Sequence, residues 1–186
     1  MTLLVIGLLL FMGVHFTPSL LPELKSSWRG KMGEGGYKGS FSLLLLASFG
    51  LMIVGWRSVD PTLVYMPSPA LRQPAIALVA VAFILLIVGS LNSRIRQWVR
   101  HPQLTGVLLW ALAHLALNGD SRSVVLFSAL ALWSGIEILS ISKREGPWVK
   151  AAIPSMGAEI AIVLIAAVTI AATVYAHPYI TGMPVF

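Results

Sequence analysis

Apolar runs separated by short polar connections take up most of this sequence. A helix needs about 20 apolar residues to cross the hydrocarbon core of a bilayer, and fewer where polar flanks reach the interface. Six runs approach that length, at residues 3–21, 41–56, 74–91, 102–117, 124–142 and 157–176. With 57% hydrophobic and only 11% charged residues, a soluble domain would aggregate. The sequence therefore predicts an all-α fold, a polytopic bundle of about six transmembrane helices.

The first run has the character of a retained span and not of a cleaved signal peptide. No positively charged segment precedes it, it has no small-residue cleavage site, and it contains a histidine. No internal repeat, low-complexity tract or linker divides the chain, so residues 1–186 are predicted to form a single transmembrane domain. The longest polar stretch, 22–40, is rich in glycine and is predicted to be an interfacial segment.

The basic residues lie between the spans and are unevenly distributed. The first, third and fifth connections hold Lys25, Arg29, Lys31 and Lys38, then Arg94, Arg96 and Arg100, then Lys143, Arg144 and Lys150. The second and fourth hold only Arg57, Arg72 and Arg122. Because positively charged connections stay in the cytoplasm, both termini are predicted on the periplasmic side of a bacterial inner membrane. The net charge of +6 is scattered over short loops, which indicates contact with anionic lipid and not with nucleic acid.

Histidines and carboxylates inside the predicted spans are the first functional candidates, because ionisable groups are costly within a bilayer. His15 lies in the first span, His114 in the fourth, Glu137 in the fifth and Glu159 just inside the sixth; His101 opens the fourth span and His177 closes the sixth. The chain has no cysteine, which excludes disulfides, iron–sulfur clusters and thiolate metal sites. Any metal must use histidine, methionine or oxygen.

His15 and His114 are the pair that depth favours. At 1.5 Å per helical residue, His114 lies roughly 18 Å and His15 about 10 Å from the cytoplasmic ends of their spans. Helix tilt averages about 20°, so both side chains can meet one flat cofactor. His177 lies at the opposite membrane face from His101 and is a poorer partner for His15. The alternative is that each histidine is hydrogen-bonded to a neighbouring helix.

The two histidines share a local pattern in which a glycine, an aromatic residue and the histidine follow at i, i+4 spacing. The sets are Gly7, Phe11 and His15, and Gly106, Trp110 and His114. Glycine lets a planar group approach the backbone, an aromatic ring packs against it, and imidazole is an axial ligand of haem iron. The pattern suits a porphyrin between two helices. Small residues also mediate ordinary packing of membrane helices, which is the competing interpretation.

Other polar and aromatic residues have simpler expected roles. His101 before Pro102 suits a helix start, with Arg100 and His101 pairing with haem propionates as the functional alternative. Glu137 is expected to meet a polar partner or to line a substrate path. The remaining expectations are a turn at Asn118 and Asp120, interfacial anchoring by Trp28, Trp56 and Trp148, and capping of the sixth span by Glu159.

The segment 100–106, RHPQLTG, continues to WALAH at 110–114 and NGD at 118–120, and resembles the signature of the NnrU family. Residues 13–25 resemble that family's first-span histidine motif, residues 33–42 its entry to span two, and residues 176–178 its C-terminal end. The family includes bacterial proteins associated with denitrification. It is also similar to the plant and cyanobacterial 15-cis-zeta-carotene isomerases. The resemblance covers most of the chain.

The resemblance to the carotene isomerases implies a haem b bound by two histidines, with catalysis when reduced iron gives up one axial ligand. The matching positions are His15 and His114. Those relatives have a cysteine three residues before the second histidine, where this chain has Ala111, so ligand switching through sulfur is not available here. The expected functions are redox sensing, chemistry linked to nitric oxide and denitrification, or isomerisation of a lipophilic polyene that enters from the membrane.

Two other classes of function compete with the haem interpretation. Arg100-His101-Pro102, followed by Gly106, also resembles the membrane isoprenylcysteine carboxyl methyltransferases. Those enzymes place a paired Glu-Glu after the next span, where this chain has Glu137 followed by Ile138. The third interpretation is a non-enzymatic assembly factor that contacts respiratory or denitrification proteins through its helices. It predicts that replacing both histidines leaves function intact.

Overall fold

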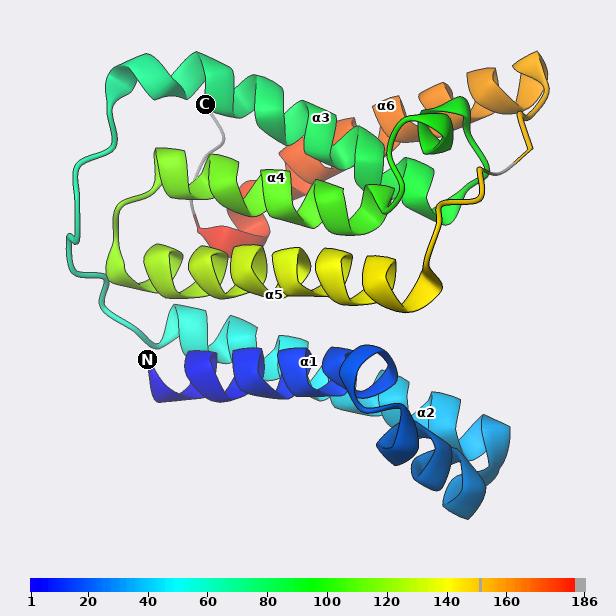
Figure 1. The fold of residues 1–186 in the computed structure, drawn as a ribbon. Coiled ribbons are helices and arrows are strands. Elements are labelled where there is room, and N and C mark those ends of the chain that lie inside the picture. The colour runs from blue at the N-terminus through cyan, green and yellow to red at the C-terminus, as the bar shows by residue number, and fades with distance from the viewer. Residues whose placement is uncertain (151, 183–186) are drawn as a thin grey trace.

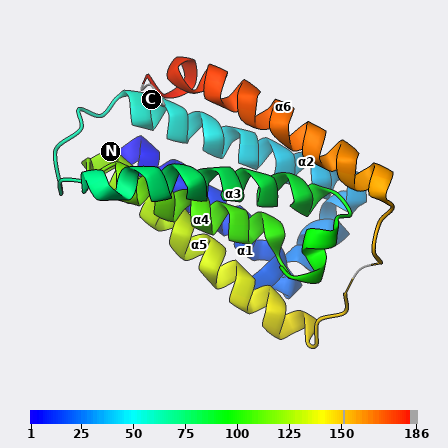
Figure 2. The same ribbon diagram turned by 90° about the horizontal axis from the view of Figure 1, so that it is seen from above.

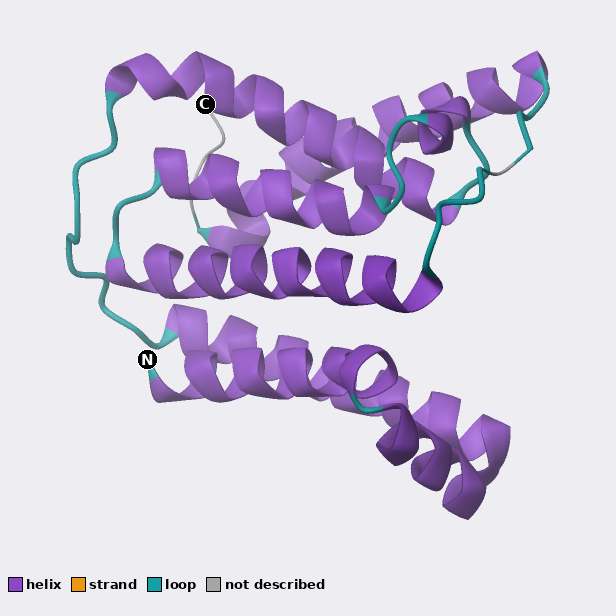
Figure 3. Cartoon of the chain, in the orientation of Figure 1, coloured by secondary structure: helices purple, strands orange, loops and turns teal. Residues whose placement is uncertain are grey.

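The computed structural model describes residues 1–150 and 152–182. Helices provide nearly all the regular structure of this part of the chain (Figure 3), beside one isolated β-bridge between Leu63 and Asp120. The predicted all-α fold is therefore confirmed. The last residues of the single predicted domain, 183–186, lie outside the described residues.

In the described part of the chain, six α-helices alternate in direction along one common axis (Figures 1 and 2). They are α1 (Thr2–Leu20), α2 (Pro22–Arg57), α3 (Arg72–Ser90), α4 (Pro102–Leu117), α5 (Ser121–Glu145) and α6 (Met156–Thr181), with short 3₁₀ turns η1 (Pro69–Leu71) and η2 (Arg94–Gln97). Five of the six are long and apolar enough to cross a membrane, and α4 is a shorter apolar helix of 16 residues. The predicted polytopic bundle is confirmed.

Helix ends follow local side-chain chemistry. Asp120 caps α5 by accepting a hydrogen bond from the Ser123 N–H at 3.1 Å, as expected of a residue in the tight connection after α4. Ser155 caps α6 in the same way. The prediction that Glu159 caps this helix is therefore wrong. Its carboxylate instead accepts hydrogen bonds from the Arg94 N–H at 2.7 Å and from the Ser93 hydroxyl, which ties α6 to the start of η2.

Helix α2 includes both the polar stretch predicted as interfacial and the second predicted span. The helix breaks at Gly33, whose φ of 70° and ψ of 174° are accessible to glycine and strained for other residues. Across this break the rings of Trp28 and Tyr37 meet edge to face, with centroids 5.0 Å apart. Figure 1 shows the two parts of α2 folded against each other at the lower right. The polar stretch is thus helical and packed on the second span.

The core joins two helix pairs through α5. Helix α1 packs on α2, α3 packs on α4, and α5 contacts both α1 and α4, whereas α6 lies beside α3. The buried cluster at the centre comprises Leu4, Leu8, Phe11, Met52, Ala111, Phe127, Leu130 and Trp133. Helix α5 therefore lies between the two helices that carry His15 and His114.

The connection between α2 and α3 crosses over the turn between α4 and α5. The Val64 N–H donates to the Gly119 carbonyl, and the Ser121 N–H donates to the Thr62 carbonyl, each at 2.8 Å. A Cβ on Gly119 would collide with the Tyr65 carbonyl, so only glycine fits this turn. The predicted turn at Asn118 and Asp120 is confirmed. Hydrogen bonds from the connection between α2 and α3 hold it in place.

The first, third and fifth connections meet at one end of the bundle, on the right of Figure 1. Ten of the thirteen Lys and Arg residues lie in the segments predicted as these three connections, six of them within the helical ranges of α2 and α5. Helix α1 begins and α6 ends at the opposite end (Figures 1 and 2). The fold thus concentrates positive charge at one end, and the assignment of that end to the cytoplasm stays a prediction.

Candidate functional site

The two intramembrane histidines have closely similar local settings. The Nδ1 atom of His15 lies 2.9 Å from the Phe11 carbonyl oxygen, and Nδ1 of His114 lies 2.8 Å from the Trp110 carbonyl oxygen. A ring nitrogen facing a carbonyl carries the proton, so each contact assigns the donor role to Nδ1 and leaves a lone pair on Nε2. Neither Nε2 has a hydrogen-bond partner among the described residues. In both imidazoles the Nδ1 contact fixes the orientation of the ring.

Aromatic rings pack against each histidine from its own helix and from α5. The ring centroid of His15 lies 4.2 Å from that of Phe11 and 5.0 Å from that of Trp133. The ring centroid of His114 lies 4.7 Å from that of Trp110 and 4.5 Å from that of Phe127. The aromatic residues singled out at i−4 therefore contact the histidines directly.

The structure does not bring His15 and His114 to one level of the bundle. His15 packs on Trp133 and His114 packs on Phe127, and these two α5 residues are six positions apart. Six helical residues correspond to about 9 Å along the axis. The two imidazoles thus differ in level by about as much as the depths of the two histidines in the sequence predict.

His177 on α6 has a depth similar to that of His114 on α4, which the sequence analysis did not consider. His114 lies three residues before the end of α4, and His177 lies four before the end of α6; both helices finish at the same end of the bundle. Helix direction was the available signal, because it gives these two histidines similar depths.

Gly7 and Gly106 lie in tight helix contacts. A Cβ on Gly7 would come 2.8 Å from the Met52 side chain on α2, and a Cβ on Gly106 would come 2.8 Å from the Ala82 carbonyl on α3. The backbone surface that each glycine opens is thus occupied by a neighbouring helix. This arrangement favours the packing interpretation for both, and a role toward a cofactor stays a prediction.

Two buried polar atoms lack partners in the contact between α5 and α1. Glu137 is 3% exposed; its Oε1 accepts a 2.7 Å hydrogen bond from the Ser19 hydroxyl, and its Oε2 has no partner among the described residues. The Trp133 indole N–H, one helical turn earlier, is also unpaired. Buried polar groups are normally satisfied, so unpaired ones mark a place where a polar group can be accommodated. Both belong to the surroundings of His15. The polar partner expected for Glu137 is the hydroxyl of Ser19.

Arg100 and His101 connect the start of α4 to the end of α5. His101 occupies the N-cap position before Pro102, as expected, and its Nε2 lies 2.9 Å from the Ser142 hydroxyl. Arg100 forms an ion pair with Glu145 at 3.4 Å. Ser142 is nine residues beyond Trp133, about 14 Å along α5. The structure thus gives both side chains partners at the basic end of the bundle, and their pairing with haem propionates stays a prediction.

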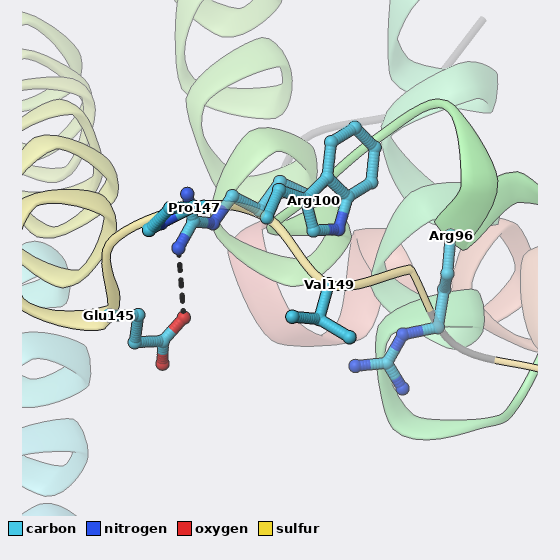
Figure 4. A pocket seen from close by; sticks show the side chains of 6 residues that line it. Arg96, Arg100, Glu145, Pro147 and Val149 are labelled. Carbon is cyan, nitrogen blue, oxygen red and sulfur yellow. Dashed lines mark hydrogen bonds and ion pairs between the residues drawn. The ribbon is translucent and has the colours of Figure 1, made fainter.

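A cavity of about 260 Å³ opens beside this ion pair (Figure 4). Its lining comprises Arg96, Arg100, Glu145, Pro147, Trp148 and Val149. A second cavity, of about 220 Å³, lies between α3 and α6 and is lined mainly by aliphatic side chains, with Ser93 and Glu159 among them. Within residues 1–150 and 152–182, no three His, Cys, Asp or Glu side chains cluster in a way suited to a metal ion.

The apolar helices, with the partly buried His15 and His114 and the buried Glu137 among them, define a multi-pass helical membrane protein. The chain belongs to the NnrU protein family, whose model matches residues 3–185. No curated protein and no solved structure matches the chain. The family assignment made from the histidine motifs is therefore confirmed over nearly the whole sequence.

Proposed function

We propose that this NnrU-family protein binds haem b at the bacterial inner membrane, with His15 and His114 as the iron ligands. The observation that carries the proposal is the matched state of the two imidazoles. Each has Nδ1 bonded to the carbonyl four residues earlier, an aromatic ring against it, and a free Nε2. Histidines that ligate metals have their second nitrogen fixed in this way, which sets ring orientation and raises ligand basicity.

Bound haem would supply reversible axial ligation and one-electron chemistry to a redox, nitric-oxide-linked or polyene-isomerising function. The surrounding chain supplies the environment. Phe11, Trp110, Phe127 and Trp133 exclude water around the two imidazoles. The unpaired Trp133 N–H is a hydrogen-bond donor for a polar group of the cofactor or of a lipophilic substrate. Ala111, at the position of the cysteine in the isomerase-like relatives, is fully buried and offers no sulfur.

Absorption spectra of the detergent-purified protein, expressed with haem supply, test the proposal. We expect a six-coordinate low-spin b-type spectrum in the oxidised and dithionite-reduced states. His15→Ala and His114→Ala are each expected to abolish it or to make it high-spin. His101→Ala separates an iron ligand from a propionate partner: His101 bonds Ser142 at the basic end of the bundle and is not a proposed iron ligand, so the spectrum of this variant is expected to stay low-spin.

His177→Ala separates two ligand pairs. If His15 and His114 are the ligands, the spectrum of His177→Ala equals that of the wild type. If the spectrum depends on His114 and His177 but not on His15, then His177 is the second iron ligand in place of His15. A colourless wild-type protein would contradict haem binding altogether. In that case retention of function by the His15→Ala/His114→Ala double variant would favour the assembly-factor interpretation.

A membrane methyltransferase is the second candidate, because the cavity of Figure 4 lies beside Arg100-His101-Pro102. The charges of the cavity oppose this assignment. Two guanidinium groups face one carboxylate, that of Glu145, and S-adenosylmethionine itself carries net positive charge. The methyltransferase predicts a colourless protein that binds S-adenosylmethionine, so the same preparation distinguishes the two functions.

A further inference from the structure

The cavity at the basic end of the bundle is an unassigned polar site between two connections. Arg96 comes from η2, Arg100 lies just before α4, and Glu145 ends α5. Trp148 and Val149 belong to the connection that leads to α6. Figure 4 shows the side chain of Val149 between the Arg100–Glu145 pair and the guanidinium of Arg96.

The guanidinium groups of this cavity have spare hydrogen-bond donors. Arg96 donates only a long bond of 3.5 Å to the Leu91 carbonyl, and no described carboxylate lies within ion-pair distance of it. Arg100 meets one oxygen of the half-exposed Glu145 carboxylate at 3.4 Å. Lys150 adds a further positive charge 5.4 Å from the Trp148 ring. Since a guanidinium presents five N–H donors and matches phosphate geometry, the site suits a singly charged phosphate group.

Exposed apolar side chains surround the cavity. Trp98, next to η2, is 77% exposed, and Val149 is 88% exposed. Tryptophan and exposed aliphatic side chains at the end of a helical bundle are typical of the interface with lipid head groups. The neighbour of Arg96 in η2, Ile95, lines the apolar cavity between α3 and α6. Adjacent residues of one short turn thus line a polar and an apolar cavity.

We propose that this cavity binds the phosphodiester head group of an anionic lipid of the phosphatidylglycerol type. Arg96 and Arg100 donate hydrogen bonds to the phosphate oxygens, and an acyl chain extends along the apolar cavity between α3 and α6. The net positive charge of the lining and its position beside exposed aliphatic groups select an anionic amphiphile over a soluble cation. Neither His15 nor His114 lines the cavity, whereas Arg100, a predicted partner of the haem propionates, does.

Native mass spectrometry of the full chain in detergent, titrated with defined lipids, tests this proposal. Wild type is expected to retain phosphatidylglycerol in preference to phosphatidylcholine. Arg96→Gln/Arg100→Gln is expected to bind phosphatidylglycerol about tenfold more weakly, because two charge-assisted hydrogen bonds are lost. Lys25→Gln/Lys31→Gln is the matched control, since it removes the same charge from the same end of the bundle outside the cavity, and we expect it to keep wild-type affinity.

Glu145→Gln gives a prediction of opposite sign that holds even if the double arginine variant fails to fold. Removing the Glu145 carboxylate frees the Arg100 guanidinium and also removes a negative charge that repels phosphate. Glu145→Gln should therefore bind phosphatidylglycerol more tightly than the wild type does. Equal binding of the two lipids by wild type, or equal losses in the arginine and lysine variants, would overturn the proposal. Glycerol 3-phosphate binding as tightly as the lipid, or displacement of the lipid by S-adenosylmethionine, would also overturn it by identifying a soluble ligand.

Discussion

The hydrogen bond from Ser19 is the only one that the Glu137 carboxyl group accepts within the described chain, although Arg144 also acts on it electrostatically. Removing a partner from a buried polar group costs its desolvation, about 1–3 kcal/mol. Ser19→Ala is therefore expected to lower the free energy of unfolding by that amount. In a Glu137→Leu background, where no carboxyl remains to be satisfied, the same substitution should cost almost nothing. Denaturant unfolding in detergent measures both, and equal costs in the two backgrounds would contradict the coupling.

His101 gives a pH dependence of stability at the basic end. Burial lowers the pKa of His101 below its ordinary value of about 6.5; nearby Arg100 lowers it further, and Glu145 opposes the shift. The unfolded chain therefore takes up a proton first as the pH falls. The contribution of His101 to stability is therefore fully present above pH 6.5. It is lost as the pH falls from 6.5 to the pKa of His101 in the folded protein.

The corresponding experiment compares melting temperatures of wild type and His101→Gln at pH 8 and pH 5. Glutamine keeps a polar side chain near Ser142 but cannot titrate, so the decrease in Tm on acidification should be smaller in the variant. A decrease of the same size in both proteins would show that protonation of His101 does not contribute.

Contacts within one helix are predictable from the sequence, because residues four positions apart lie on the same helix face. The i, i+4 spacing placed Phe11 and Trp110 against their histidines, and both contacts are present. The unpaired Trp133 N–H was not predicted, since an indole without a partner depends on which side chains of α1 lie opposite it.

At the scale of elements, the α3–α4 contact depends on Gly106. A Cβ there would come 2.8 Å from the Ala82 carbonyl and 2.9 Å from Leu86 Cγ. Gly106→Ala is therefore expected to destabilise the protein by about 1–3 kcal/mol through overpacking. Gly135→Ala, within α5 and with nothing inside 4 Å of its added Cβ, is the matched control and should be neutral or stabilising by up to about 1 kcal/mol. Unfolding in detergent compares the two, and equal effects would contradict a specific role for Gly106.

Element boundaries were predicted well wherever polarity changes sharply. The span 102–117 coincides with α4, because Pro102 suits a first helical turn and the Asn118–Asp120 turn ends the helix. For the stretch 22–40 the sequence predicts an interfacial segment but does not show that it is helical. Its glycines lower helix propensity, and contacts made after folding, such as Trp28 with Tyr37, stabilise the helix.

At the scale of the whole molecule, the order of neighbouring helices decides which histidines can act together. The position of a residue along its span predicts its depth in the membrane. It does not predict which helices are neighbours, and so it does not show that α5 packs between α1 and α4. Depth predicts that His15 and His114 meet one flat cofactor although their levels differ by about 8 Å. In the structure they pack against α5 residues six positions apart, which is a similar difference in level, and α5 contacts both of their helices. Neighbour order in a bundle depends on packing between faces that are all apolar, which leaves little signal in a single sequence.

The orientation of the bundle in its membrane follows from the charge at its two ends. The end with ten of the thirteen basic residues should remain in the cytoplasm, which places the α2–α3 connection on the periplasmic side. Because the chain has no cysteine, labelling of a single introduced cysteine shows the accessibility of that position without a background from native thiols. Met66→Cys, at a position 78% exposed, should react with a membrane-impermeant maleimide in intact spheroplasts, whereas Val149→Cys should react only after lysis. The reverse pattern would invert the bundle and place both the lipid-binding cavity and the Arg100–Glu145 pair on the periplasmic side.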